Sequence, residues 1–173
     1  IDGFTITTTN DYVMDFYNSS VTLNDIIVNQ KIKFEHYNDS NNSNEIDRNF
    51  TINGLQSDHG IDFLYYGTDV NSAYDNITCN FSNLNITVDD GDIFTVDGSA
   101  DNQYREYKLR FTLNIDESIL SASENVFDED IYQYYNTYSY FLGSISNSTI
   151  SGDFFTDNAS RGNTSFTFSK SIF

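Results

Sequence analysis

Apolar and polar residues alternate with a period of two along most of this 173-residue chain. The alternation is clearest in residues 3–9 (GFTITTT), 31–37 (KIKFEHY) and 105–116 (REYKLRFTLNID). Such a pattern is typical of β-strands that bury one face and expose the other. Only residues 117–127 (ESILSASENVF) favour a short helix instead. The pattern therefore predicts an all-β protein.

Clusters of Asn, Asp, Ser and Gly separate these segments, for example in residues 36–47 and 88–92. These residue types favour turns. About nine or ten strands joined by turns at short spacing predict an antiparallel β-sandwich or jelly roll, such as an immunoglobulin-like fold. No internal repeat and no domain boundary stands out. We therefore expect residues 11–173 to form a single sandwich domain that follows an N-terminal strand in residues 1–10.

Acceptor sequences for N-glycosylation, Asn-X-Ser/Thr, are abundant in this chain. Ten of the 22 Asn residues begin such a sequon, about twice the number expected from random placement. Glycosylation requires a secreted chain and a solvent-facing Asn, so we expect a secreted, extracellular or cell-surface protein with N-linked glycans. The acceptors are Asn18, Asn38, Asn41, Asn49, Asn76, Asn80, Asn85, Asn147, Asn158 and Asn163.

Several sequons agree in phase with the strand pattern. Residues i and i+2 of a strand point the same way, so the Asn and the Ser or Thr of a sequon share one face. In residues 76–81 this phase places the Asn and Thr outward and Ile77, Cys79 and Phe81 inward. Residues 84–88 repeat the arrangement. The pattern predicts sheet surfaces that carry glycans, although Asn-rich coding in an organism without the glycosyltransferase would also produce it.

Composition and charge make some classes of binding partner unfavourable. The net charge is −18, with 26 acidic and only eight basic residues, so binding to nucleic acid or to an anionic membrane surface is disfavoured. No apolar run is long enough for a transmembrane helix. The 15 Phe and 13 Tyr supply a large aromatic core. Because the chain begins with Ile rather than Met, we interpret it as a mature form whose signal peptide has been removed.

The residues that most often carry catalysis form no recognisable motif here. Cys79 lies on the apolar phase of its segment, which predicts a buried, inert thiol rather than a reactive or intermolecular one. His36 and His59 lie in polar segments far apart, and we expect surface residues rather than a metal pair. No two of the 26 acidic residues stand out as the carboxylate pair of a glycosidase. The sequence thus favours a protein that is not an enzyme, with a glycan-active enzyme as the weaker alternative.

Calcium is the one metal that the sequence suggests, and no other cofactor is required. Two Asp/Gly turns bracket residues 93–96 and could offer carboxylate and carbonyl oxygens, the ligands that Ca²⁺ prefers. Solvated turns explain the same residues and are the interpretation that we favour. Divalent cations would also relieve repulsion between acidic subunits. The candidate ligands are Asp89, Asp90, Asp92, Asp97 and Asp101.

A row of tyrosines forms a further candidate binding surface. Tyr132, Tyr134, Tyr138 and Tyr140 share one face of a predicted strand. Tyrosine is favoured at interfaces because its large ring keeps a polar tip. The row fits a subunit contact, a platform for sugar rings or a partly buried core face.

The two ends of the chain suggest how subunits join. Residues 1–9 and 165–173 are amphipathic strands, in which Phe4, Ile6, Phe166, Phe168 and Ile172 form the apolar positions. Each strand either completes its own sheet or is added to the sheet of a neighbour, where main-chain hydrogen bonds supply the affinity. A head-to-tail exchange does not close and produces a filament.

In its processed start and alternating leader GFTITTT, the chain resembles donor-strand pilins and TasA-like and archaeal thread-like filament subunits. The likeness covers the architecture and the two terminal segments, and it implies a β-sandwich that assembles with copies of itself. Unlike in many chaperone–usher pilins, Cys79 has no partner cysteine.

Together these features predict a structural subunit of a secreted, heavily N-glycosylated filament or surface coat. Copies would join head to tail by β-strand addition. The alternative is a monomeric extracellular module for carbohydrate binding or adhesion, with or without calcium.

Overall fold

The computed structural model describes residues 1–38, 47–67, 75–100, 107–132, 137–157 and 164–173. These residues form thirteen strands and no helix. The strands are β1 (Thr5–Ile6), β2 (Tyr12–Tyr17), β3 (Val21–Val28), β4 (Lys31–Asn38), β5 (Asp47–Ser57), β6 (Ile61–Gly67), β7 (Asp75–Val88), β8 (Phe94–Ala100), β9 (Tyr107–Asp116), β10 (Ile119–Tyr132), β11 (Thr137–Ser146), β12 (Thr149–Asp157) and β13 (Thr164–Ser169).

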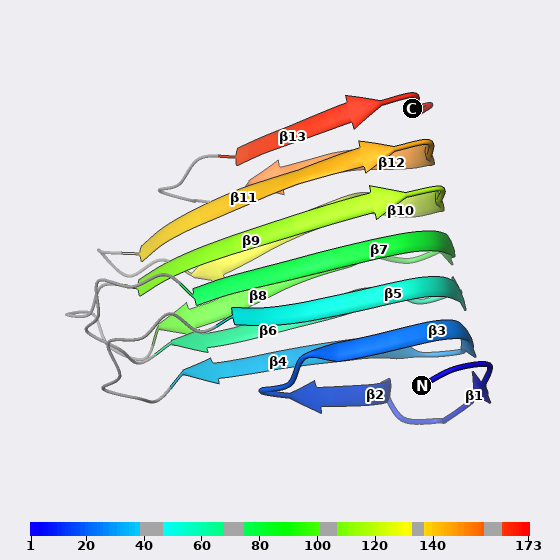
Figure 1. Ribbon diagram of the computed structural model, residues 1–173, viewed down its shortest axis with the longest axis horizontal. Helices are drawn as coiled ribbons and strands as arrows, with labels where there is room; N and C mark the ends of the chain where they lie inside the picture. Colours follow the sequence, from blue (N-terminus) through cyan, green and yellow to red (C-terminus); the bar gives the residue numbers. More distant parts are fainter. Residues whose placement is uncertain (39–46, 68–74, 101–106, 133–136, 158–163) are drawn as a thin grey trace.

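Every pair of neighbouring strands is parallel. The odd-numbered strands stack in the order β1-β3-β5-β7-β9-β11-β13, and the even-numbered strands stack from β2 to β12. Figure 1 shows the two stacks as layers whose arrows point in opposite directions, with the termini at opposite ends. The chain thus winds as a parallel β-solenoid. One sheet wraps almost completely around the core, because the start of β10 also pairs with the end of β7.

The predicted antiparallel sandwich is therefore wrong. Alternation reports that a strand has two different faces, but it carries no information on strand direction. The polar clusters predicted hairpin turns, whereas each odd-numbered strand from β3 to β13 bends, within it or directly after it, at one residue with positive φ. These corner residues occupy one register position on successive coils: Asp25, Gly54, Asn83, Glu117, Asn147 and Lys170, with φ between 49° and 78°. A bend at one residue redirects the strand onto the next face without reversing it.

The sequence also hid the repeat and suggested a helix that does not form. Register partners along the odd stack lie 29, 29, 34, 30 and 23 residues apart: Leu23, Ile52, Phe81, Ile115, Ile145 and Phe168. Such unequal spacing shows no fixed period to a sequence comparison. Residues 117–127 form the corner at Glu117 and the first part of β10 rather than a helix.

Inward side chains fill the solenoid with stacked aliphatic and aromatic residues. The ring of Phe111 lies 5.1 Å from that of Phe63 and 6.0 Å from that of Phe141, which belong to other coils. Cys79 is fully buried, as predicted. Burial also confirms the predicted phase of residues 76–81, since Ile77, Cys79 and Phe81 point inward.

Candidate functional site

The odd-numbered strands present an outer surface of short hydroxyl and amide side chains, the odd-sheet face. Two columns of register partners run along it, perpendicular to the strands, and contain a single carboxylate although the chain carries a charge of −18. The first column is Thr22, Thr51, Asn80, Asn114, Ser144 and Thr167, and the second is Asn24, Asn53, Ser82, Asp116, Ser146 and Ser169.

Hydrogen bonds link neighbouring coils along these columns. Ser144 Oγ donates to Asn114 Oδ1 at 3.0 Å, and Asn114 Nδ2 donates to Asn80 Oδ1 at 3.0 Å. In the second column, Ser82 Oγ donates to Asn53 Oδ1 at 3.1 Å. The side chains are therefore held in place before any ligand arrives.

Asp116 supplies the one charge in the two columns. Its carboxylate accepts hydrogen bonds from Ser146 Oγ at 2.7 Å and from Asn147 Nδ2 at 2.8 Å. Because these bonds favour the ionised form, they lower the pKa of Asp116 below its ordinary value.

Two shallow hollows mark the surface on this side of the solenoid. The Asn80 hollow, of about 300 Å³, lies within the odd-sheet face and is lined by Thr51, Asn80, Phe81, Ser82, Asn114, Ile115, Asp116, Ser144 and Ser146. The Asn85 hollow, of about 410 Å³, lies beyond the corner residues and is lined by Ile27, Val28, Asn29, Gln56, Ser57, Asp58, Asn85 and Thr87.

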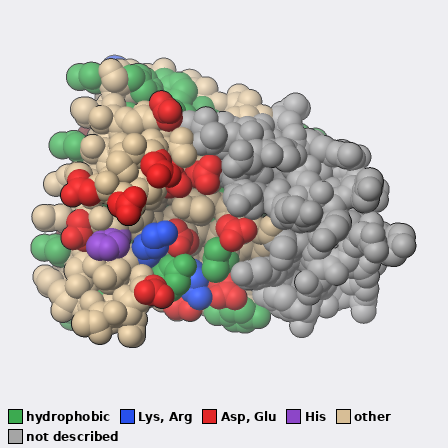
Figure 2. Space-filling view, turned by 180° about the vertical axis from the view of Figure 1, so that it is seen from behind, with side chains coloured by type: hydrophobic (Ala, Val, Ile, Leu, Met, Phe, Trp, Pro, Cys, Tyr) green, Lys and Arg blue, Asp and Glu red, His purple; other side chains and the backbone are tan. Residues whose placement is uncertain are grey.

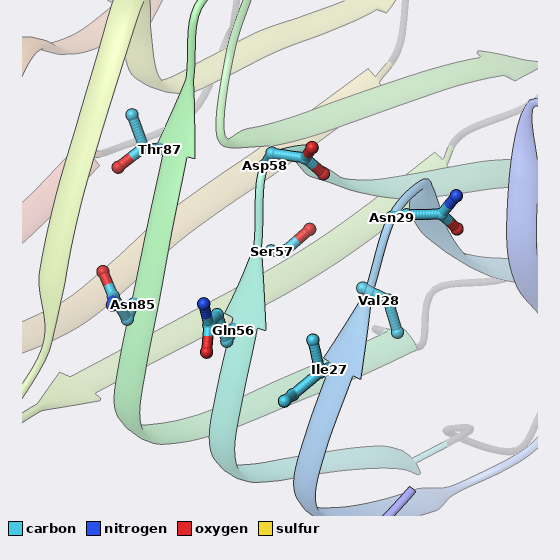
Figure 3. A pocket seen from close by; sticks show the side chains of 8 residues that line it. All are labelled: Ile27, Val28, Asn29, Gln56, Ser57, Asp58, Asn85 and Thr87. Atoms are coloured by element: carbon cyan, nitrogen blue, oxygen red, sulfur yellow. The ribbon is translucent and has the colours of Figure 1, made fainter. Parts of the chain in front are cut away.

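Figure 3 shows that the Asn85 hollow crosses three coils. Ile27 of β3, Gln56 of β5 and Asn85 of β7 are register partners and lie side by side. All three are exposed, Ile27 by 45%. Asp58 and Thr87 follow two residues after Gln56 and Asn85. The hollow thus combines amide, hydroxyl, carboxylate and apolar side chains. Of its lining residues, only Asn85 was a candidate site residue in the sequence.

The predicted acceptors occupy several parts of the surface. Asn49, Asn76 and Asn80 lie on the odd-sheet face, and Asn85 lies just after the corner of β7. Asn18 and Asn147 have positive φ and occupy bends. All six are exposed or partly exposed. Asn38 ends β4, but its side chain and the acceptors Asn41, Asn158 and Asn163 lie outside the described residues.

The even-numbered strands present a different, acidic surface, which Figure 2 shows from behind. Lys33 Nζ lies 2.7 Å from Asp15 and 3.1 Å from Glu35, and these carboxylates raise the pKa of Lys33 to about 12. Burial and the neighbouring Asp62 raise the pKa of Tyr12 to about 12. The charge of Lys33 is thus compensated by the neighbouring carboxylates, and the face as a whole remains negatively charged.

The candidate calcium ligands do not converge in the described part of the chain, where no group of three metal-binding side chains is found. Asp89 and Asp90 are exposed, and Asp92 Oδ1 accepts the backbone and side-chain N–H groups of Asn125 at 2.7 and 2.9 Å. Asp97 lies on β8, and Asp101 lies outside the described residues. Calcium binding therefore stays a prediction.

His36, Tyr65 and Asp75 form a buried group of polar side chains. His36 is 2% exposed, so the predicted surface position is wrong for this residue. Its Nε2 lies 3.4 Å from Asp75, which also accepts the hydroxyl of Tyr65. These side chains are buried and line neither hollow. We therefore assign them a role in packing rather than in catalysis.

The terminal segments lie within their own sheets. Thr5 and Ile6 pair with Ile27 and Val28 in parallel. Phe4 is 57% exposed, whereas Ile6 packs against the core. At the other end Phe166 also packs against the core, while Phe168 and Ile172 are exposed.

The row of tyrosines is only partly described. The side chains of Tyr132, Tyr134 and Tyr138 lie outside the described residues, and Tyr140 is partly buried. In the described part of the chain no helix is long and apolar enough to cross a membrane. No protein-family model, curated protein or solved structure matches this chain.

Proposed function

We propose that this chain is a structural module of a secreted, N-glycosylated filament or surface coat, in which copies stack end to end by β-strand addition. The observation that carries the proposal is the position of the exposed large hydrophobic residues. Of eight in the described part of the chain, six belong to the first or last coil: Ile1, Phe4 and Tyr17 at one end and Phe168, Ile172 and Phe173 at the other.

The last coil ends in a cluster of aromatic rings. The ring of Phe168 lies 5.0 Å from that of Phe154 and 4.9 Å from that of Phe173, both in edge-on geometry. Phe168 and Phe173 are 41% and 66% exposed. Exposed apolar groups that cluster in this way favour burial against a partner.

Strand direction makes the two ends compatible. Within the described part, β13 pairs only with β11 and β2 only with β4. β12 pairs with β10, and on its other side only its first residue, Thr149, is bridged, by Ile172. Because all strands are parallel, the first coil of one copy can stack on the last coil of another and continue both layers. The contact is head to tail and does not close, so it extends into a filament.

This mode of assembly replaces the insertion of residues 1–10 into a neighbour. Those residues pair in parallel with β3 of the same chain, where Ile27 N donates to Phe4 O at 2.9 Å. Strand addition therefore uses the open edges of the terminal coils. Lateral association is opposed by the charge of −18, whereas each end carries three exposed large hydrophobic side chains.

The test is sedimentation velocity and electron microscopy of the protein and two variants, at low and high salt. Phe168→Asp should abolish end-to-end assembly while circular dichroism reports an unchanged fold. Ile119→Asp is the matched control, since Ile119 is 56% exposed but lies on the side of the solenoid. Added salt should favour assembly because it screens repulsion between copies. A protein that stays monomeric under all these conditions, or equal loss in both variants, would refute the proposal.

A second candidate, binding of neutral polysaccharide by an adhesion module, is favoured by the odd-sheet face, whose two columns carry a single charge, that of Asp116. The hydroxyl and amide groups of this face suit sugar hydroxyls, and a neutral ligand avoids repulsion by the acidic chain. The test is co-sedimentation of unglycosylated protein with cellulose or chitin. Thr51→Ala should weaken binding about threefold, as expected for one lost hydrogen bond. Thr95→Ala, on the outer side of β8, should have no effect.

A further inference from the structure

Each of the two surface hollows is lined by both the Asn and the hydroxyl residue of one sequon: Asn85 with Thr87, and Asn80 with Ser82. The hollows lie on different faces of the solenoid, on either side of the corner residue Asn83. Two glycosylation acceptors therefore each lie beside a hollow, and the two hollows have different linings.

The acceptor nitrogens in the hollows differ from those of Asn76 and Asn147. Asn76 Nδ2 donates to Asp47 at 2.8 Å, and Asn147 Nδ2 donates to Asp116 at 2.8 Å. Asn80 uses Oδ1, not Nδ2, to bond Asn114. Among the described residues, no acceptor takes the Nδ2 of Asn80 or Asn85. A glycan replaces one of the two hydrogens on Nδ2, and in Asn80 and Asn85 neither hydrogen is held by a residue that the structure describes, so the sugar can be attached in either direction.

We propose that the first sugars of the N-linked glycans on Asn85 and Asn80 lie down in these hollows and contact the neighbouring strands. The proposal rests on the N-glycosylation in the proposed function and assigns the hollows to the protein's own glycans. The seated sugars then act as part of the folded surface rather than as mobile appendages.

The Asn85 hollow has the groups that a sugar ring needs. It runs from Asn85 across Gln56 to Ile27, perpendicular to the strands (Figure 3). A ring attached to Asn85 Nδ2 places hydroxyl or acetamido groups next to the Gln56 amide and the Asp58 carboxylate. Its C–H face can cover Ile27, which is 45% exposed. Burial of that apolar surface supplies a favourable term that a glycan projecting into water lacks.

The Asn80 hollow is a more polar seat. Thr51 and Asn114 are the register partners of Asn80 on either side, and Asp116 also lines the hollow. A sugar there exchanges hydrogen bonds with hydroxyl and amide groups already held by the column. We therefore expect the glycan on Asn85 to stabilise the fold more strongly than the glycan on Asn80.

The test uses protein secreted from a eukaryotic host that adds glycans beginning with N-acetylglucosamine. Thr87→Ala removes the sequon but keeps Asn85, and Thr87→Ser keeps the sequon. Thr149→Ala is the matched control: it removes the sequon of Asn147, which lies at a bend and lines neither hollow. Glycopeptide mass spectrometry gives the occupancy, and thermal unfolding gives the Tm of each protein and of the same proteins made without glycans.

We expect Thr87→Ala to lower the Tm of the glycosylated protein by about 2–4 °C, the shift of about 1 kcal/mol in a domain of this size. Thr87→Ser and Thr149→Ala should leave it within about 1 °C, and none of the three should differ in unglycosylated protein. Ile27→Ala should remove most of the gain that glycosylation brings. An occupied Asn85 with no Tm effect would overturn the seat while leaving the glycoprotein proposal intact. An unoccupied Asn85 in the secreted protein would overturn the seat and count against that proposal as well.

Discussion

Asn114 Nδ2 donates to Asn80 Oδ1 at 3.0 Å on the adjacent coil, although 34 residues separate the two side chains. Asn114 Oδ1 in turn accepts the hydroxyl of Ser144. Through these two hydrogen bonds Asn114 joins three coils at one register position, so its contribution to stability depends on the parallel stacking. A side chain that looked like an ordinary polar strand residue is thus a cross-link between coils.

Replacing Asn114 should weaken this cross-link. Asn114→Ala removes two hydrogen bonds in a partly exposed setting and should lower the free energy of unfolding by about 1–2 kcal/mol. Urea denaturation measures the change. Thr112→Ala, on the same outer face of β9, is the control and should cost less. Equal costs for the two variants would mean that the column adds nothing to stability.

Gly143 should tolerate no side chain. A Cβ added there would lie 2.0 Å from the carbonyl oxygen of Leu113 and 2.8 Å from the ring of Phe166. The carbonyl belongs to β9 and cannot retreat without disturbing the ladder. We expect Gly143→Ala to cost about 3 kcal/mol by overpacking. Gly91→Ala, with φ of +106° and open space around it, makes no clash and should cost about 1–3 kcal/mol, from backbone strain alone.

The thiol of Cys79 should be unreactive in the folded protein. Complete burial raises the pKa of this thiol well above its ordinary value, which leaves almost no thiolate to react. We expect labelling by a thiol reagent to be slow in buffer and fast in denaturant, with the native rate limited by opening of the fold. Labelling in buffer as fast as in denaturant would contradict the buried position.

The carboxylate of Asp116 should contribute to the pH dependence of stability. Its pKa is lowered in the folded state, so its stabilising contribution is present above the ordinary pKa and is lost as pH falls through the lowered value. The effect should be small because the group is exposed. We expect Ser146→Ala to raise the pKa of Asp116 toward its ordinary value, as measured by NMR titration. An unchanged pKa would mean that the hydrogen bond from Ser146 does not cause the shift.

Several local features followed from the sequence alone. The period of two predicted strands correctly, because successive side chains of a strand point to opposite faces of the sheet. The same phase placed Cys79, Ile77 and Phe81 in the core, and burial confirms it. It also predicted which Asn side chains would face outward in residues 76–81.

Strand direction, partners and the sites were decided only by the tertiary structure. The corners that make the strands parallel carry Asp, Gly, Asn, Glu and Lys, so no residue type marks them in the sequence. The burial of His36 depends on its approach to Asp75, 39 residues away, and the pairing of Gln56 with Asn85 depends on how the coils stack. Hydrophobic alternation fixes the faces of each strand, whereas the stacking of coils fixes which side chains meet.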